Sequence, residues 1–357
     1  MATGRTRLSI PGVAIASAFF ALCSVAPSAS ADSSEASQVG IGVEVSRATL
    51  ERGAPAPLAP NAAGDADLVA PAAIPYDKWR GLSGGCSYLA PRSEFIGAAD
   101  GSVDVLVHFH AGQMAQRQLV ESGTGAVFVS CGFGIGSGAY AEAFSNPHRF
   151  GRMVDELVKN LSGATKKVNL KVRHLALASW SAGFAAVGKI LAVDRYYAMV
   201  DTVVLNDSLH SQYMDPNPKT AAQGAERVDV KMLRTFIRFA KDAAVPNGKK
   251  TMVMTHSAII TPDYATSTEA TKALLTAIDV PTTAVLAEDV TAQTSWRGMS
   301  LSMRADSGNL HVRGFRGRGP KDHFEHLYLI GEALRSWVVP RWKREDRLVY
   351  TLAGEQL

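Results

Sequence analysis

Short apolar runs alternate with amphipathic patterns along the chain from Tyr76 onward. The runs are rich in β-branched residues, as strands are, and the stretches between them repeat apolar positions every three or four residues, as helices do. The predicted strands cover residues 103–108, 126–130, 175–178, 200–205 and 251–255. Strands that alternate with helices form a mostly parallel, doubly wound sheet with flanking helices, and the pattern therefore predicts this α/β class.

Capping signals locate two of the helices. Asn146 and Pro147 are a cap residue and a proline at the first helical position, and Gly163 lies where a left-handed residue would end the helix. Its apolar stripe consists of Phe150, Met153, Val154, Leu157, Val158 and Leu161. Thr266 and Glu269 form a capping-box pair that opens another helix. Near the C-terminus the pattern predicts a hairpin over residues 301–315 and a last helix over residues 322–337.

The first residues have the pattern of an export signal. Arg5 and Arg7 precede an apolar stretch over residues 13–26 and small residues at 29–31, which predicts a cleavable signal peptide over residues 1–31. The apolar stretch is short for a membrane span, and no later segment is long enough, so no transmembrane segment is expected after cleavage. The predicted location is therefore secreted or periplasmic.

Three regions follow the signal peptide. Residues 32–75 are rich in Ala and Pro, poor in aromatics and without a helical or strand period, which predicts a flexible linker. Residues 76–340 are long enough for one α/β domain with a sizeable core, and residues 341–357 are interpreted as a C-terminal tail. The net charge of +4 argues neither for nor against nucleic-acid binding by itself, and no nucleic-acid partner is expected.

The chain has three cysteines. Leu22 directly precedes Cys23, where a bacterial lipoprotein signal needs a small residue, and this argues against a lipid anchor. Export favours a disulfide between Cys86 and Cys131, and the alternative is two buried free thiols.

The strongest local signal for chemistry is Ser179-Trp180-Ser181-Ala182-Gly183, where a buried strand passes into a helix. Such a turn is so tight that the positions two before and two after a nucleophile must be small, and the central residue takes a strained conformation. The turn lifts the Ser181 hydroxyl out of the sheet edge. The competing interpretation is a serine-rich cap at an ordinary strand-to-helix junction.

This turn resembles the GxSxG elbow of the α/β-hydrolase superfamily, with Ser179 in place of the first glycine. The resemblance covers most of residues 103–337 and includes the superfamily's order of nucleophile, acid and histidine. It implies that Ser181 is the nucleophile, His323 the general base and Asp207 the acid. The segment Lys321–Leu327 resembles the superfamily's terminal segment, in which the histidine lies on the loop just before the final helix.

Each of the last two roles has a competitor. The superfamily places its acid after either of two strands, so Asp263 is the alternative to Asp207. His326 is the alternative to His323, although within a helix a histidine is more often packed or exposed.

Oxyanion donors are expected from two backbone segments. The amide of Ala182 lies at the start of the helix after the nucleophile. The second donor is expected from residues 110–112, His-Ala-Gly, which stand in for the His-Gly-Gly motif of esterases. The candidate amides there are those of Ala111, Gly112 and Gln113.

His108 and His110, two apart on a predicted strand, would point to the same face, a spacing found in metal-dependent hydrolases. Further ligands at recognisable spacing are absent, so no metal and no cofactor are expected. One of the two histidines is expected to pack beneath the oxyanion loop.

A basic cluster precedes His323. It consists of Arg313, Arg316, Arg318 and Lys321. It is interpreted either as a solvated loop or as a cationic rim that attracts an acidic substrate.

The sequence thus predicts an exported serine hydrolase, an esterase or lipase with an amidase as the alternative, that cleaves a small-molecule or polymeric ester or amide through an acyl-enzyme on Ser181. Two other classes are kept. One is a non-catalytic hydrolase-like domain that binds an envelope or extracellular ligand, and the other is a metal-dependent hydrolase using His108 and His110. The oligomeric state is not predicted.

Overall fold

The computed structural model describes residues 74–343 and 345, apart from residues 99, 168–169, 216–223 and 287–296. The predicted signal peptide and all but the end of the predicted linker lie outside these residues. Every described residue belongs to one compact unit, which lies within Asp67–Leu357.

The described residues form one ten-stranded sheet in the order β1-β2-β4-β3-β5-β6-β7-β10-β9-β8. The strands are β1 (Arg80–Leu82), β2 (Cys86–Leu89), β3 (Ser102–Phe109), β4 (Val127–Cys131), β5 (Lys171–Trp180), β6 (Thr202–Asn206), β7 (Thr251–His256), β8 (Thr283–Ala284), β9 (Leu301–Ser307) and β10 (Leu310–Phe315). The run from β4 to β10 is parallel, and the outer strands on both sides pair antiparallel. The predicted class, a mostly parallel α/β sheet with flanking helices, is confirmed.

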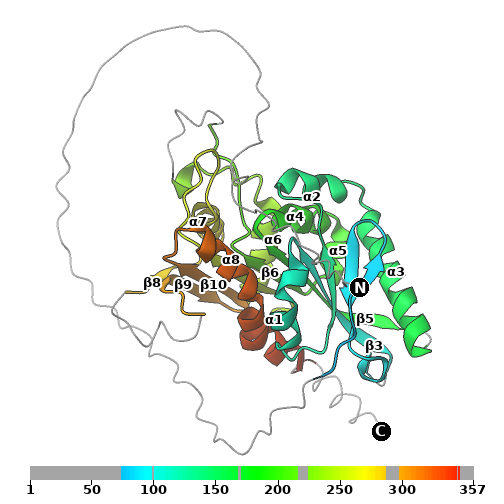
Figure 1. Ribbon diagram of the computed structural model, residues 1–357. Coiled ribbons are helices and arrows are strands. Elements are labelled where there is room, and N and C mark those ends of the chain that lie inside the picture. The colour runs from blue at the N-terminus through cyan, green and yellow to red at the C-terminus, as the bar shows by residue number, and fades with distance from the viewer. Residues whose placement is uncertain are drawn as a thin grey trace, which may run out of the picture. The chain divides into compact units, whose positions relative to one another are not determined.

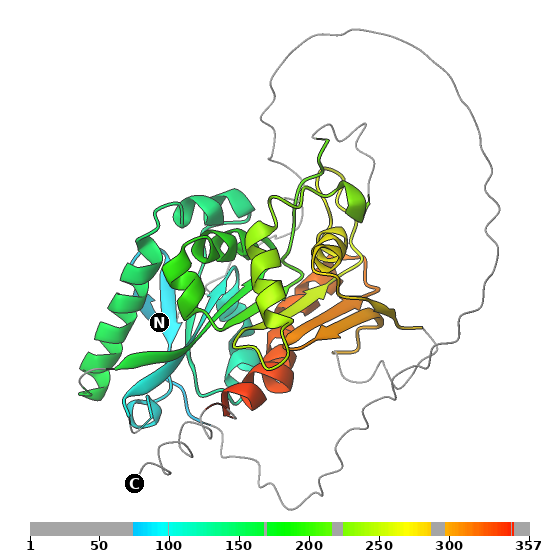
Figure 2. The ribbon, with the colours of Figure 1, turned by 180° about the vertical axis from the view of Figure 1, so that it is seen from behind.

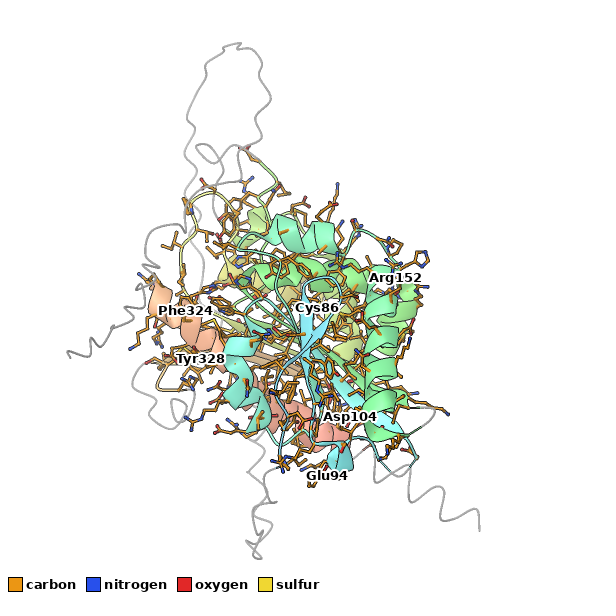
Figure 3. All side chains as sticks on the ribbon, turned by 45° about the vertical axis from the view of Figure 1, so that its right-hand side comes forward. Cys86, Glu94, Asp104, Arg152, Phe324 and Tyr328 are labelled. Atoms are coloured by element: carbon orange, nitrogen blue, oxygen red, sulfur yellow. A yellow bond between two sulfur atoms is a disulfide. The ribbon has the colours of Figure 1, made fainter. Side chains whose placement is uncertain are left out.

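Helices cover both faces of the sheet, as the two opposite views show (Figures 1 and 2). The helices are α1 (Gln116–Val120), α2 (Ser137–Ala143), α3 (Arg149–Thr165), α4 (Phe184–Leu191), α5 (Asp194–Met199), α6 (Arg234–Ala243), α7 (Ser267–Ala277), α8 (Pro320–Tyr328) and α9 (Ile330–Ala333), which continues into a π-helix (Leu334–Val338). Short 3₁₀ turns cover Ser93–Phe95, Gly112–Ala115, Ser181–Gly183 and Ala225–Arg227. Figure 3 shows Phe324 and Tyr328 along α8 and Arg152 on α3.

The strands divide their side chains between two apolar cores. In β3, Val105 and Val107 belong to the core that includes residues of α2 to α7, whereas Leu106 belongs to the core under α1, α8 and α9. This alternation follows from the two-residue period of a strand. Because both faces of the central strands are covered, their residues are apolar almost without interruption, which is the pattern that the sequence showed.

Two strands precede the one that the sequence predicted as the first. β1 and β2 were not predicted because they are three and four residues long, and Arg80 and Gly81 of β1 are exposed. Such short segments show no measurable period. α3 also differs, because Gly163 stays within the helix and the left-handed residue that ends it is Lys166, with φ of 56°.

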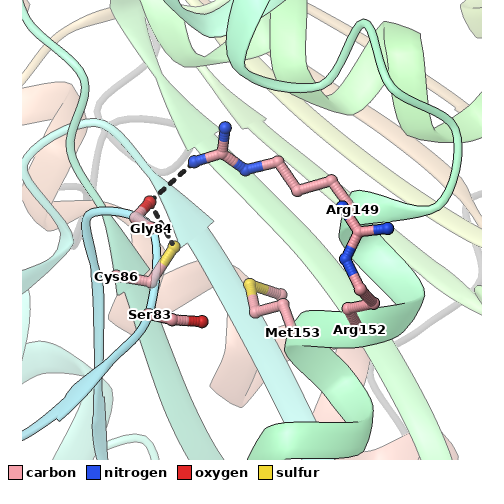
Figure 4. A pocket seen from close by; sticks show the side chains of 6 residues that line it. All are labelled: Ser83, Gly84, Cys86, Arg149, Arg152 and Met153. Carbon is pink, nitrogen blue, oxygen red and sulfur yellow. Dashed lines mark hydrogen bonds between the residues drawn. The ribbon is translucent and has the colours of Figure 1, made fainter.

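Cys86 and Cys131 are directly opposite each other in β2 and β4 and form a disulfide with an S–S distance of 2.06 Å. The sequence left open a disulfide or two free thiols, and the structure has the disulfide. A hollow of about 250 Å³ lies beside it, and Arg149 and Met153 of α3 contribute to its wall (Figure 4). None of the candidate site residues lines this hollow.

The sequence predicted that the domain ends at residue 340, but the residues that pack on it continue beyond this position. Arg341 and Trp342, assigned to the tail by their sequence position, are 5% and 3% exposed. The Trp342 indole donates to Asp201 Oδ1 at 3.1 Å and stacks on the His174 ring, so the domain includes these residues. Within the described part of the chain, a helix with the length and apolar character of a membrane span is not found.

Candidate active site

The junction between β5 and α4 has the backbone of a nucleophile elbow. Trp180 is extended, with φ of −119°, Ser181 is left-handed, with φ of 51°, and the chain then enters helical conformation. A left-handed conformation is unfavourable for a residue with a side chain, and it is concentrated at functional turns. The Ser181 side chain is half-buried.

Gly183 allows this turn to pack closely on the neighbouring strand. A Cβ atom at Gly183 would lie 2.3 Å from the Phe109 carbonyl oxygen at the end of β3. Its backbone is ordinary and helical, with φ of −64°, so the requirement for glycine is one of space. The small residue that the elbow pattern demanded two positions after Ser181 is therefore needed here.

His323 and Asp207 meet at the same edge of the sheet. The His323 Nδ1–H donates to Asp207 Oδ2 at 2.7 Å, and the two side chains are 16% and 3% exposed. Asp207 directly follows β6 and has a left-handed backbone, with φ of 46°. His323 lies within the first turn of α8, not on a loop before the helix, because α8 begins at Pro320.

The other carboxylate oxygen of Asp207 is held by two donors. The Ser257 amide donates to Oδ1 at 2.9 Å, and the Ser267 hydroxyl donates to the same atom. Burial alone would raise the pKa of Asp207, but the nearby imidazoles of His326 and His323 and the Ser257 hydrogen bond lower it well below its ordinary value. Asp207 is therefore a carboxylate at neutral pH, with its orientation fixed from both sides.

Asp263 and His326, the alternatives for the acid and the base, lie in different surroundings from Asp207 and His323. Asp263 is exposed on the segment after β7, and the carboxylate bonded to His323 is that of Asp207. His326 is fully buried, and its Nδ1 pairs with Thr255 Oγ1 at 2.7 Å. Burial lowers the pKa of His326 to about 4, although Asp207 nearby acts in the opposite direction. His326 is thus a neutral, packed side chain near pH 7.

His326 is expected to make the stability of the fold depend on pH. As the pH falls below 6.5, the unfolded chain takes up a proton at this position while the folded chain resists until about pH 4, so this stability is complete above pH 6.5 and lost between 6.5 and 4. Replacing His326 with asparagine should reduce the slope of unfolding free energy against pH by about 1 kcal/mol per pH unit near pH 5.

Denaturant unfolding at several pH values measures this slope independently of any constant loss of stability in the variant. His148 is exposed, so His148→Asn is the matched control and should keep the wild-type slope. Equal slopes for wild type and His326→Asn would contradict the prediction.

Trp180 joins the elbow to the segments on either side. Its indole N–H donates to the His323 carbonyl oxygen at 2.8 Å. Its ring contacts those of His323, His110 and Phe324, with centroids 4.7, 5.0 and 5.1 Å away. The residue directly before Ser181 therefore fixes the position of the histidine-bearing helix and of the loop after β3.

The loop after β3 has two left-handed residues in succession, His110 and Ala111, with φ of 71° and 57°. Gly112 follows in a 3₁₀ turn, and a Cβ atom there would lie 2.9 Å from the His108 Cβ. His108 therefore packs beneath this loop, as expected for one of the two histidines. The loop lies close to the elbow through the contact between His110 and Trp180.

His108 and His110 do not share a strand, because β3 ends at Phe109. His110 Nδ1 pairs with the Tyr140 hydroxyl at 2.7 Å, whereas His108 is fully buried. Burial lowers the pKa of His110 to about 4 and that of His108 to about 3. Over the residues that the structure describes, there is no group of three or more His, Cys, Asp or Glu side chains that could hold a metal ion.

The basic cluster before His323 is partly engaged in the fold. Arg313 pairs with Asp306 at 3.0 Å, and the Arg316 guanidinium donates to the Val285 carbonyl. Arg318, just before α8, and Lys321, in the first turn of α8, are exposed.

Sequence reasoning did not identify four residues that shape the site: Trp180, Ser208, Ser257 and Ser267. Trp180 occupies the variable position of the elbow pattern, so the pattern gave it no weight. Ser208 adjoins Asp207, and Ser267 is the first residue of the helix opened by the capping box at Thr266. These neighbours were visible in the sequence, but their partners come from distant segments.

Comparison with solved structures finds esterases at low identity. A cold-adapted esterase from an Arctic intertidal metagenomic library is 12% identical, with a TM-score of 0.36, over 71% of this chain and 87% of that chain. A carboxylesterase from Mesorhizobium loti is 9% identical, with a TM-score of 0.38, over 73% and 99%. A ferulic acid esterase is 13% identical, with a TM-score of 0.39, over 73% and 98%. No family model and no curated protein matches the chain by sequence.

Proposed function

We propose that this protein is a serine hydrolase that cleaves a carboxylic ester or amide through an acyl-enzyme on Ser181. The observation that supports this best is the hydrogen bond between His323 Nδ1 and Asp207 Oδ2, formed beside a strained serine elbow. A serine hydroxyl is a poor nucleophile at neutral pH unless a base takes its proton. His323 is that base, and its Nε2 is left as acceptor because Nδ1 carries the proton bonded to Asp207.

In the first step the Ser181 oxygen attacks the substrate carbonyl carbon while its proton passes to His323 Nε2. Asp207 stabilises the resulting imidazolium. The negative charge on the carbonyl oxygen is stabilised by the Ala182 amide and by an amide of Ala111 or Gly112. The tetrahedral intermediate then collapses, and the alcohol or amine leaves with the proton from His323.

In the second step water replaces the leaving group. The water oxygen attacks the acyl carbon while His323 takes a proton from the water. His323 then returns this proton to the Ser181 oxygen, and the acid product leaves. The same three side chains serve both steps, with Ser181 as the nucleophile in the first step and as the leaving group in the second.

We further propose that the protein is exported and acts outside the cytoplasm. The first 31 residues have the pattern of a signal peptide, and the disulfide between Cys86 and Cys131 is a bond that persists in oxidising compartments. An exported hydrolase meets small-molecule and polymeric esters or amides, and both are candidate substrates.

A fluorophosphonate probe tests the proposal directly, because it reacts with an activated serine. The wild-type protein should be labelled on Ser181, Ser181→Ala should not be labelled, and His323→Ala should be labelled far more slowly. A set of chromogenic esters of graded acyl chain length, run beside Ser181→Ala, then measures turnover.

A matched control is Ser122→Ala. Ser122 is another buried serine, and its hydroxyl donates to the Leu119 carbonyl oxygen at the end of α1. Its variant should label as the wild type does. Absence of labelling in the folded wild-type protein would instead support the alternative, a hydrolase-like domain that only binds its ligand.

A further inference from the structure

Two buried serines connect the elbow with the turn that bears Asp207. Ser208 Oγ lies 2.8 Å from the Ser181 carbonyl oxygen and 2.7 Å from Ser179 Oγ. Ser179 and Ser208 are both fully buried. A carbonyl oxygen carries no proton, so the Ser208 hydroxyl must donate to it, and Ser179 must then donate to Ser208. The result is a directed chain of hydrogen bonds from Ser179 through Ser208 to the backbone of the nucleophile.

The carbonyl that ends this chain belongs to the peptide group that joins Ser181 to Ala182. The N–H of that same peptide group is the candidate oxyanion donor. A peptide group is planar, so a hydrogen bond on its oxygen fixes the direction of its N–H. Hydrogen bonds in series also polarise one another, and more strongly where water is excluded, which makes the N–H a better donor.

Resting on the proposed function, we infer that Ser208 and Ser179 are positioning residues for the oxyanion donor, with Ser208 acting on the Ser181–Ala182 peptide and Ser179 acting only through Ser208. This accounts for a departure noted in the sequence. Ser179 occupies the position of the first glycine of the elbow pattern, and a glycine there would have no hydroxyl to donate. Because Ser208 directly follows Asp207, the same turn orients both the carboxylate for His323 and the donor for the oxyanion.

The inference predicts a loss confined to the transition state. Removing an oxyanion donor outright lowers kcat by roughly 10² to 10³-fold, and weakening one from a distance should cost less. Ser208→Ala is expected to lower kcat about tenfold with KM unchanged, and Ser179→Ala about threefold. The affinity for a trifluoromethyl ketone, which forms a tetrahedral oxyanion on Ser181, should fall in parallel with kcat.

The double variant gives the sharpest result. If Ser179 acts only through Ser208, Ser179→Ala combined with Ser208→Ala should be no slower than Ser208→Ala alone, about tenfold below wild type. Independent effects would multiply to about thirtyfold. Ser122→Ala removes a buried serine-to-carbonyl hydrogen bond elsewhere and should leave kcat and KM unchanged.

Three results would overturn the inference: wild-type kcat in Ser208→Ala, a raised KM with kcat intact, or multiplying losses in the double variant.

A readout without turnover separates this test from that of the proposed function. In the ligand-free protein the Ala182 amide proton should shift upfield in the NMR spectrum of Ser208→Ala, because its peptide group is less polarised. If that shift occurs in a protein that no fluorophosphonate labels, the hydrogen-bond chain stands and the proposed function fails. If labelling occurs without the shift, the chain is wrong and the proposed function stands.

Discussion

Asp207→Asn is expected to lower kcat by roughly 10⁴-fold while KM stays close to the wild-type value. The amide keeps the size of the carboxylate, but it has no charge to stabilise the imidazolium that forms on His323. An amide nitrogen facing Nδ1 would also donate to it, which places the ring proton on Nε2, where the base must be free to accept. The measurement is steady-state kinetics on the best chromogenic ester, with fluorophosphonate labelling as a second readout.

Asp263→Asn is the matched control, since both acids follow neighbouring strands and only Asp207 is bonded to His323. The exposed Asp263 should tolerate the change with kcat close to wild type. The reverse outcome, a large loss in Asp263→Asn and a small one in Asp207→Asn, would reassign the acid and disprove the arrangement around His323.

The sequence was sufficient for those features that depend on local chemistry. The apolar runs gave the central strands because strands buried on both faces leave little choice of residue type. The elbow was visible because a tight turn at Ser181 requires small neighbours whatever the rest of the chain does. The capping box at Thr266 and Glu269 was found for the same reason, and both side-chain hydrogen bonds of that motif are present.

Other features depend on contacts between distant segments, and the sequence left them open or wrong. The choice between Asp207 and Asp263 depends on the left-handed backbone at Asp207 and on donors from Ser257 and Ser267, at least 50 residues away along the chain. The placement of His323 in a helix depends on where α8 starts. Trp342 was assigned to a tail because its partners, His174 in β5 and Asp201 just before β6, are more than 140 residues away along the chain.

The elbow is also where a substitution is expected to have a large effect on the stability of the fold. Gly183→Ala should lower the free energy of unfolding by roughly 3 kcal/mol or more, because the new Cβ would lie 2.3 Å from the Phe109 carbonyl oxygen. That oxygen is backbone of the central strand β3, so it cannot move aside as a flexible side chain would. Either α4 shifts away from the sheet or the strand distorts, and in both cases Ser181 is displaced. Denaturant unfolding of the purified variant measures the loss, and kcat for ester hydrolysis should fall with it.

Gly163→Ala separates this effect from the general consequences of replacing a glycine. Gly163 lies inside α3, and apart from the neighbouring backbone of that helix no atom is within 4 Å of a Cβ atom placed there. Alanine is favoured over glycine in a helix interior by about 0.5–1 kcal/mol, so this variant should be more stable than the wild type. Both glycines have helical backbones, and both substitutions add one methyl group. If Gly183→Ala lowers the free energy of unfolding and Gly163→Ala raises it, the close approach of α4 to β3 is what requires glycine at position 183. Wild-type stability in Gly183→Ala would instead mean that a Cβ atom fits at the elbow, and would contradict the prediction.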